Sequence, residues 1–360
     1  MKIGILEPYI EGIGGAQKVI AKYTNYLREK GHQIEILTTR YNPNTCYPEF
    51  KKIPIKLIGS KSKFLSPMAF NREFRGFDIL IANDWPSNFA SLKNDNVIWI
   101  CYTPKRDFYD LKDYYFNLAG FKEKVILNLK QIFFQSVDIK SAKLMKQILP
   151  ISETVRKRVK QSYGISCKNL FYCGIDFNKY KSKKSKDYFL SVARFVKPKR
   201  IELIIEAMKY VKTNIWLFIV GNGPDKEKII NLCNQAENVK FLGNVSESKL
   251  KELYAECLGL IYIPVNEDWG LIPLEAAASE KPIIASNEGG LRETIINNKT
   301  GILIDQLSSE NIAEKIDLLE INKKLALKLG KQAKINCKKY DWSRLLPKFE
   351  EIIFKNIKYK

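Results

Sequence analysis

The chain has 360 residues, enough for two domains whose hydrophobic cores need no covalent cross-links. Its composition, with 45% hydrophobic, 28% charged and 12% aromatic residues, is typical of a globular protein and excludes a disordered or fibrous chain. The formal net charge of +21, of which the first 180 residues carry +13, favours anionic partners, although a lysine-rich surface that only keeps the protein soluble is an equal alternative.

Apolar, β-branched runs alternate with amphipathic helical stretches, which indicates parallel strands joined by helical crossovers. The strands predicted in the first half are 2–6, 33–38, 55–58, 78–82, 97–101 and 148–152, and a helix from Ala16 to Lys30 follows the first of them. Those predicted in the second half are 188–192, 215–220, 239–243, 257–263 and 282–286. The polar, lysine-rich segment 174–187 is the predicted linker. We therefore expect an α/β protein with two facing open sheets, whose strand-to-helix loops carry the chemistry.

The first such loop is E-P-Y-I-E-G-I-G-G-A-Q, residues 7–17. Gly12, Gly14 and Gly15 permit close approach of the backbone, and the free N–H groups of a helix start favour an anion. The G-x-G-G spacing differs from the G-x-G-x-x-G of dinucleotide sites, and the second strand runs into T-T-R rather than an acid. An NAD-dependent oxidoreductase is therefore disfavoured, and a tight turn without a ligand is a further alternative.

Three loops of the second half carry candidate binding residues. Arg194 and Lys199 follow the strand 188–192, where they can neutralise a diphosphate, although isolated cations are most often solvated surface charges. Gly221 lies in the turn I-V-G-N-G-P. Gly243 and Asn244 lie in F-L-G-N-V-S, whose backbone can face a planar base. Each of the two glycine turns is a weak signal alone.

The stretch N-E-D-W-G-L-I-P-L-E-A-A-A-S-E-K-P, residues 266–282, contains two carboxylates. Pro273 suits the first turn of a helix, so Glu275 is expected in that turn and Glu267 in the loop before it. The helix start offers N–H groups to a phosphate, and a carboxylate there can accept hydrogen bonds from a ribose diol. The alternatives are compensation of the helix dipole by Glu275, a solvated loop acid at Glu267, or a hydrolase-like acid/base pair. A second Gly-Gly loop, S-N-E-G-G-L-R-E-T-I, follows at 286–295.

Cysteine usage and hydropathy address the compartment. The seven cysteines form no C-x-x-C pair and have no histidine nearby to complete a zinc site, so we expect reduced thiols in the cytosol and no metal. The chain begins without a signal-peptide pattern, and no run approaches the roughly 18 apolar residues of a spanning helix. Secretion by a signal peptide and anchoring by a helix are therefore not expected.

Taken in order, the motifs A-R-F-V-K-P-K-R, V-G-N-G-P, F-L-G-N-V, E-D-W-G-L-I-P-L-E-A and S-N-E-G-G-L-R-E-T-I resemble the family 4 retaining glycosyltransferases, and the match covers nearly the whole chain. The resemblance implies the GT-B architecture, in which two Rossmann-like domains with parallel sheets face each other. It divides this chain into an acceptor-side domain (1–173), a linker (174–187), a nucleotide-sugar domain (188–340) and a C-terminal helix that packs back on the first domain (341–360).

The resemblance also implies residue roles. Arg194 and Lys199 hold the nucleotide diphosphate, Glu275 binds the ribose hydroxyls and Glu267 lies next to the transferred sugar. The predicted backbone contacts to the donor are at Gly14, Gly15, Gly221, Gly243, Asn244, Gly270 and Leu271. A nucleotide-diphosphate sugar is then a co-substrate, neither cofactor nor metal is expected, and the configuration of the transferred hexose is retained. The cations stabilise the departing diphosphate, which takes the acceptor's proton.

The segment V-I-W-I-C-Y-T-P-K-R-D-F-Y-D, residues 97–110, departs from the family pattern. Many relatives have His before the Ser/Thr-Pro, where this chain has Tyr102, and the single histidine, His32, is predicted in a surface turn. We therefore expect no histidine base at the sugar and hypothesise that Tyr102 contacts the donor. A catalytically silent relative is the alternative. The T-P-x-R-x-x-Y-D pattern favours GDP-mannose as the donor.

The region 105–160 combines 13 Lys and Arg residues with interleaved aromatic and aliphatic residues. It is a candidate surface for docking on an anionic membrane, where a cytoplasmic enzyme would reach a lipid-linked acceptor, and a solvated basic face is the alternative. A glycan is the other expected acceptor. A nucleic-acid-binding protein is disfavoured because the sequence contains neither a groove-reading helix nor a stacking motif.

Overall fold

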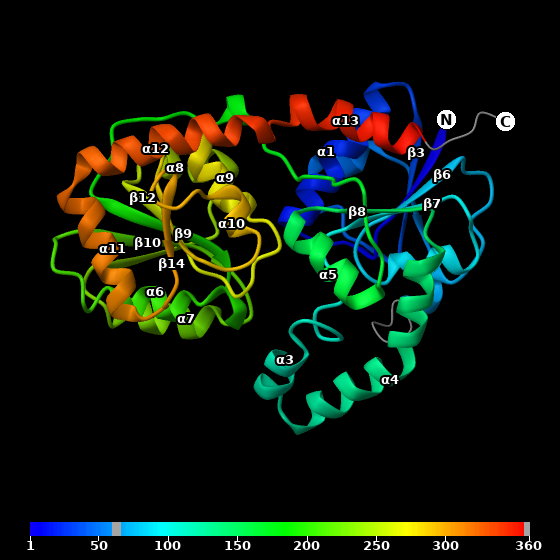
Figure 1. Cartoon of the computed structure of the whole chain (residues 1–360), viewed down its shortest axis with the longest axis horizontal. Helices are drawn as coiled ribbons and strands as arrows, with labels where there is room; N and C mark the ends of the chain where they lie inside the picture. The colour runs from blue at the N-terminus through cyan, green and yellow to red at the C-terminus, as the bar shows by residue number, and fades with distance from the viewer. Residues whose placement is uncertain (60–65, 356–360) are drawn as a thin grey trace. The chain divides into compact units, whose positions relative to one another are not determined.

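The computed structural model describes residues 1–59 and 66–355, which divide into two compact units (Figure 1). The first unit comprises Met1–Tyr172 together with the C-terminal segment from Leu345, and the second comprises Cys173–Arg344. Each unit contains one six-stranded parallel sheet. The α/β class predicted from the alternating pattern is confirmed.

The sheet of the first unit has the order β5-β3-β1-β6-β7-β8. These strands are β1 (Lys2–Leu6), β3 (Gln33–Thr38), β5 (Ile55–Leu57), β6 (Ile79–Ala82), β7 (Val97–Cys101) and β8 (Gln147–Pro150). The accompanying helices are α1 (Gly15–Glu29), α2 (Ser66–Phe70), α3 (Lys112–Leu118), α4 (Phe121–Leu144) and α5 (Glu153–Tyr163), with 3₁₀ turns η1 (Pro48–Lys52) and η2 (Ser87–Leu92). A small parallel pair that we did not predict, β2 (Tyr9–Ile10) with β4 (Arg40–Tyr41), extends from the ends of β1 and β3.

The sheet of the second unit has the order β11-β10-β9-β12-β13-β14. Its strands are β9 (Tyr188–Arg194), β10 (Trp216–Asn222), β11 (Val239–Gly243), β12 (Gly259–Tyr262), β13 (Ile283–Ser286) and β14 (Gly301–Ile304). Its helices are α6 (Ile201–Ala207), α7 (Lys226–Asn234), α8 (Glu247–Glu256), α9 (Leu271–Ala278), α10 (Leu291–Thr294), α11 (Ser309–Ile321) and α12 (Lys323–Cys337), with 3₁₀ turns η3 (Phe177–Lys179), η4 (Lys197–Lys199) and η5 (Lys338–Tyr340). The strand β14 was not predicted.

Both sheets therefore have the doubly wound order of a Rossmann-type fold, in which the first strand lies next to the second and the fourth. The strand order reverses between β1 and β6 in one unit and between β9 and β12 in the other, so these are the switch points of the two sheets. The strands are apolar because helices cover both faces: Figure 1 shows α6 and α7 on one side of the second sheet and α8, α9 and α12 on the other. Ligands of such sheets bind beyond the carboxyl ends of the strands at the switch.

The C-terminal helix α13 (Trp342–Phe354) packs on the first unit over most of its length. The hydroxyl of Tyr26 on α1 donates to a carboxylate oxygen of Glu350 at 2.6 Å. The ring of Phe349 packs 5.4 Å from that of Tyr23 and 4.6 Å from that of Phe171. These contacts agree with the predicted helix that returns to the first domain.

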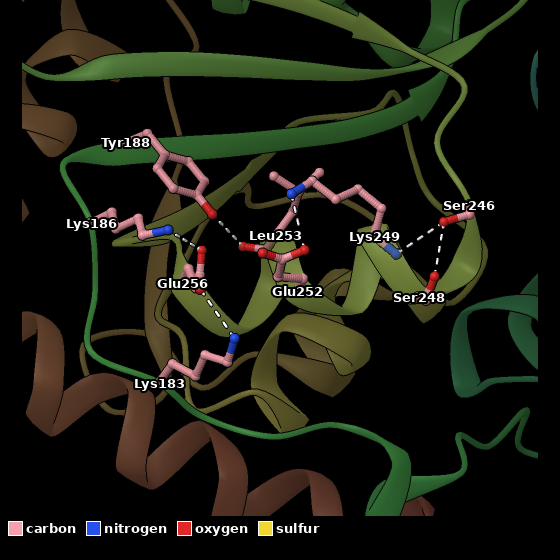
Figure 2. A network of polar contacts seen from close by, with 9 residues as sticks. All are labelled: Lys183, Lys186, Tyr188, Ser246, Ser248, Lys249, Glu252, Leu253 and Glu256. Carbon is pink, nitrogen blue, oxygen red and sulfur yellow. Dashed lines mark hydrogen bonds and ion pairs between the residues drawn. The ribbon is translucent and has the colours of Figure 1, made fainter.

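The segment 174–187, predicted as a linker, belongs to the second unit and is bound along α8 (Figure 2). The backbone N–H groups of Lys183 and Lys186 donate to the carbonyls of Ala255 at 3.0 Å and Glu256 at 2.7 Å. Their side-chain ammonium groups contact the two carboxylate oxygens of Glu256 at 3.2 and 2.5 Å. The chain therefore enters β9 with its backbone already paired to a helix.

Candidate functional site

Three loops of the second unit are joined at the carboxyl ends of the neighbouring strands β9, β12 and β13. The backbone N–H of Val265 donates to the carbonyl of Pro198 at 2.8 Å, linking the first two loops. The hydroxyl of Ser286 donates to the carbonyl of Pro264 at 3.0 Å, and the N–H of Gly290 donates to that of Glu267 at 2.7 Å. The loop that follows β12 is therefore held from both sides.

An ion pair links two of the predicted catalytic residues within this set of loops. The ammonium of Lys199, at the end of η4, lies 2.6 Å from a carboxylate oxygen of Glu267 and 3.1 Å from the hydroxyl of Tyr262. Burial opposes the charge of Lys199, but Glu267 and Tyr262 outweigh it, so that the pKa of the ammonium is raised. Burial and the charge of Glu267 likewise raise the pKa of Tyr262. The site therefore holds a permanent, positioned cation at the switch point.

Arg194 differs from Lys199 in its surroundings. It is the last residue of β9, its side chain is exposed, and among residues 1–59 and 66–355 it forms no side-chain hydrogen bond or ion pair. Because a guanidinium has several donors in a planar fork, an uncommitted one at a strand end is suited to an incoming phosphate.

Arg200 and Glu288 form a second ion pair that the sequence interpretation missed. A guanidinium nitrogen of Arg200 donates to one oxygen of Glu288 at 2.6 Å, while the other oxygen accepts the backbone N–H of Asn266 at 2.8 Å. Arg200 and Asn266 both have left-handed backbones, with φ of 51° and 49°. Glu288 therefore fixes the start of the loop that carries Glu267.

The helix α9 begins at Leu271, after Gly270 in the left-handed region with φ of 95°. In the described part of the chain no side chain caps this helix at Gly270, so its first N–H groups are available to an anion. Pro273 lies in the first turn as predicted, but Glu275 lies one turn later than predicted. Compensation of the helix dipole by Glu275 was therefore the wrong alternative, because that effect is confined to the first turn.

The carboxylate of Glu275 is buried and is held by tyrosine hydroxyls. The hydroxyl of Tyr254, on α8, donates to it at 3.1 Å, and the hydroxyl of Tyr180 also interacts with it. Burial, followed by the charge of Glu275, raises the pKa of both tyrosines. Both hydroxyls therefore keep their protons and orient the carboxylate.

The Gly-Gly loop before α10 packs directly against the loop of Glu267. A side chain at Gly289, where φ is 55°, would place Cβ 2.2 Å from the carbonyl oxygen of Glu267. At Gly290 the corresponding atom would lie 2.5 Å from the carbonyl oxygen of Asp268. These glycines are required for the close approach of the two backbones, which shapes the loop that carries Glu267.

The glycine turns after β10 and β11 lie toward the other edge of the sheet. A Cβ at Gly221, with φ of 144°, would lie 1.8 Å from the carbonyl oxygen of Ala193, so this glycine lets β10 end against β9. Gly243 has φ of 63° and is followed by the exposed Asn244. Gly221 thus has a packing role that is sufficient to explain it.

In the first unit, Gly14 precedes α1 and Gly15 is its first residue, without a side-chain cap or an acid in the first turn. Glu7, which follows β1 and was not singled out from the sequence, is fully buried. Burial, reinforced by Asp84 after the neighbouring strand β6, raises the pKa of Glu7 well above its ordinary value. A buried carboxyl group with a raised pKa therefore lies beside the switch point of this sheet.

Tyr102 is partly buried just beyond β7, and the segment after it folds around Asp110. The guanidinium of Arg106 contacts Asp110 at 2.8 Å, and that of Arg158 contacts it at 3.1 Å.

His32, which was predicted in a surface turn, is partly covered because its ring packs 4.7 Å from that of Phe354. Burial lowers the pKa of His32.

Two doubly wound parallel sheets, each in its own unit, are the GT-B architecture, and solved glycosyltransferase structures share this fold. Sucrose-phosphate synthase from Thermosynechococcus elongatus has a TM-score of 0.80 at 17% identity, covering 99% of this chain and 98% of that one. WaaG, a glycosyltransferase involved in lipopolysaccharide biosynthesis, has a TM-score of 0.70 at 16% identity, covering 98% and 99%. Family models described as Glycosyltransferase Family 4 and Glycosyl transferases group 1 match residues 13–179 and 174–336.

The chain therefore belongs to the family 4 glycosyltransferases and is a glycosyltransferase enzyme. An alpha-1,3/1,6-mannosyltransferase of Dictyostelium discoideum is 26% identical over 92% of this chain and 93% of its own length. An uncharacterized glycosyltransferase of Methanocaldococcus jannaschii is 28% identical over 53% of this chain and 55% of its own length.

Proposed function

We propose that the enzyme transfers a hexose, with retention of configuration, from a nucleoside diphosphate sugar to a glycan or lipid-linked acceptor in the cytoplasm. The observation that carries the proposal is the ammonium of Lys199, fixed by Glu267 at 2.6 Å beside the uncapped helix α9. A diphosphate placed there meets a positioned cation, free N–H groups and the uncommitted guanidinium of Arg194.

The chemistry follows from where charge develops. As the bond between the anomeric carbon and the diphosphate oxygen breaks, the oxygen gains negative charge, and Lys199 and Arg194 stabilise it without reorganising. The bond to the acceptor oxygen forms on the same face of the sugar, and the acceptor's proton passes to the departing diphosphate. Glu267 binds the transferred sugar, Glu275 accepts hydrogen bonds from the ribose, and neither carboxylate moves a proton.

The proposed donor contacts in the first unit are Tyr102 to the sugar and the backbone of Gly14 and Gly15 to the diphosphate. Backbone contacts at Gly270 and Leu271 are also proposed because these residues begin α9. The backbone of Gly243 and the exposed Asn244 are assigned to the base. No cofactor enters the proposal, since the donor is a co-substrate and the cations supply the charge stabilisation.

GDP-mannose is the proposed donor. The sequence pattern T-P-x-R-x-x-Y-D favours it, and the relatives that are named mannosyltransferases support it. A GDP-mannose-dependent mannosyltransferase of Mycobacterium tuberculosis is 30% identical over 39% of this chain. The competing donor is UDP-glucose, because a structural neighbour with 15% identity, HepE of Anabaena, is in complex with UDP and glucose.

Thermal unfolding of the full chain with a panel of nucleoside diphosphate sugars tests the proposal. A ligand present at 100 times its dissociation constant adds about 2.7 kcal/mol of stability, enough to identify the donor. We expect GDP-mannose to give the largest shift and to be turned over, which would also reject a catalytically silent relative. If no donor stabilises the protein, the proposed function is rejected. If UDP-glucose gives a larger shift than GDP-mannose, UDP-glucose is the donor.

A further inference from the structure

The helix α4 has a face that packs on the first unit and an opposite face that is apolar and exposed. One face packs on the first unit: the ring of Phe134 lies 6.2 Å from that of Trp85, and the buried carboxylate of Asp138 accepts the hydroxyls of Tyr109 at 2.8 Å and Tyr163 at 2.9 Å. These contacts lie in the carboxyl-terminal half of the helix, and the residues of α4 that are buried are Asp138, Ser141 and Ala142. The packed face therefore fixes the orientation of the whole helix.

The opposite face exposes large apolar side chains, which we call the outer face of α4. Phe121 is 84% exposed, Ile132 72% and Phe133 60%. The outer face consists of Phe121, Val125, Ile126, Leu129, Ile132 and Phe133. At about 100° of rotation per residue these positions fall within an arc of roughly 140°, and Phe134 and Asp138 lie outside it.

Such a face is unusual for a helix in contact with water, because the side away from the protein is normally polar. Figure 1 shows the amino-terminal half of α4 and the neighbouring α3 extending away from the sheet of the first unit. Leu118 at the end of α3 is also exposed. A partner that buries these side chains would gain the free energy of removing them from water.

The charges of α4 identify that partner. The helix carries five lysines against one exposed acid, Glu123, because its other acid, Asp138, is buried. By its spacing Lys122 falls inside the apolar arc and Lys130 at its border, where their ammonium groups can reach past the apolar side chains to an anionic layer. A second copy of the chain would instead bring lysines against lysines.

We propose that the outer face of α4 docks on an anionic lipid bilayer, with the helix lying along the surface and its apolar side chains among the acyl chains. The combination of an apolar face with flanking lysines is what such interfacial helices use, since apolar burial and lipid charge add. No helix in the described part of the chain is long and apolar enough to cross a membrane. Together with the proposed function, this docking favours the lipid-linked class of acceptor.

Co-sedimentation of the full chain with vesicles tests the docking. The vesicles contain phosphatidylcholine alone or mixed with phosphatidylglycerol. We expect binding to the mixed vesicles and a loss of about tenfold or more in Ile132→Ser/Phe133→Ser, which removes two exposed apolar side chains. The matched control is Ile321→Ser/Ile335→Ser, because these side chains are 76% and 68% exposed in the second unit. Control binding should equal that of the unmodified protein.

Each other outcome counts against the docking. Absence of binding to the mixed vesicles at low salt, or equal binding by both double variants, would overturn it. If the protein instead dimerises with increasing concentration, and Ile132→Ser/Phe133→Ser abolishes the dimer, the partner of the outer face is a second copy of the chain and not a bilayer. The thermal shift with GDP-mannose is measured on every variant: it reports folding, and its failure rejects the proposed donor without bearing on the docking.

Discussion

The ammonium of Lys199 lies 2.6 Å from a carboxylate oxygen of Glu267, although 68 positions separate them in the chain. The contact arises because β9 and β12 are neighbours in the sheet, and the loops that carry Lys199 and Glu267 both begin at the carboxyl ends of these strands. It joins a cation suited to a diphosphate with a carboxylate suited to sugar hydroxyls. The positions of these two side chains therefore depend on each other.

Replacing Glu267 tests this dependence. In Glu267→Gln the partly buried ammonium of Lys199 loses its charged partner, which should cost about 1–2 kcal/mol of unfolding free energy and lower the turnover. Urea unfolding and donor turnover measure the two effects. The control is Glu252→Gln, which breaks the exposed pair with Lys249 and should cost well under about 1 kcal/mol. Equal stability of the two variants would show that the pair does not hold Lys199.

Removal of the Tyr254 hydroxyl tests how Glu275 is oriented. Tyr254→Phe takes away a hydrogen bond of 3.1 Å to the carboxylate, so the donor KM should rise several-fold while kcat changes less. Tyr188→Phe is the control, because its hydroxyl donates to the carbonyl of Leu253 on the same helix α8, without touching Glu275. If both variants raise KM equally, the effect is structural and Tyr254 does not position Glu275.

A side chain at Gly289 should displace the backbone of the loop that carries Glu267. In Gly289→Ala the added Cβ meets the carbonyl oxygen of Glu267 at 2.2 Å in a left-handed backbone, so we expect a loss of at least about 2 kcal/mol of stability and weaker donor binding. The control is Gly31→Ala. Gly31 also has a positive φ, of 88°, but its added Cβ meets nothing within 4 Å. Chemical unfolding of both variants separates steric contact from backbone strain. Equal losses would mean that the contact is relieved at no cost.

The raised pKa of Glu7 predicts a pH dependence of stability. Burial, then the charge of Asp84, raise its pKa in the folded state, so the folded state binds more protons than the unfolded chain above the ordinary value of 4.5. Stability should therefore fall as the pH rises from 4.5 toward the raised pKa. In Glu7→Gln this fall should be smaller, whereas Glu49→Gln, at an exposed glutamate, should follow the unmodified protein. Parallel urea midpoints for all three proteins across this range would contradict the assignment.

The sequence predicts the sheets well because their strands are buried on both faces and appear as continuous apolar runs, as in Val97–Cys101. The strand Gly301–Ile304 was not predicted, although strands of the same length, such as Ile79–Ala82, were. Glu275 was placed one turn too early in α9 because nothing in the letters shows that Gly270 adopts a left-handed backbone and that the helix begins directly after it, at Leu271. Arg200 and Glu288 were missed because 88 positions separate them, and only the fold brings their charges together.

The central claim is that Lys199 holds the diphosphate of a nucleoside diphosphate sugar. Calorimetric titration of GDP-mannose into the unmodified protein, Lys199→Ala and Lys197→Ala measures it most directly. Lys197 is an exposed lysine in the same 3₁₀ turn and serves as the matched control. Loss of a charge-assisted contact worth about 1.5–3 kcal/mol predicts about 10- to 100-fold weaker binding by Lys199→Ala and unchanged binding by Lys197→Ala. Equal affinities of the three proteins would contradict the account.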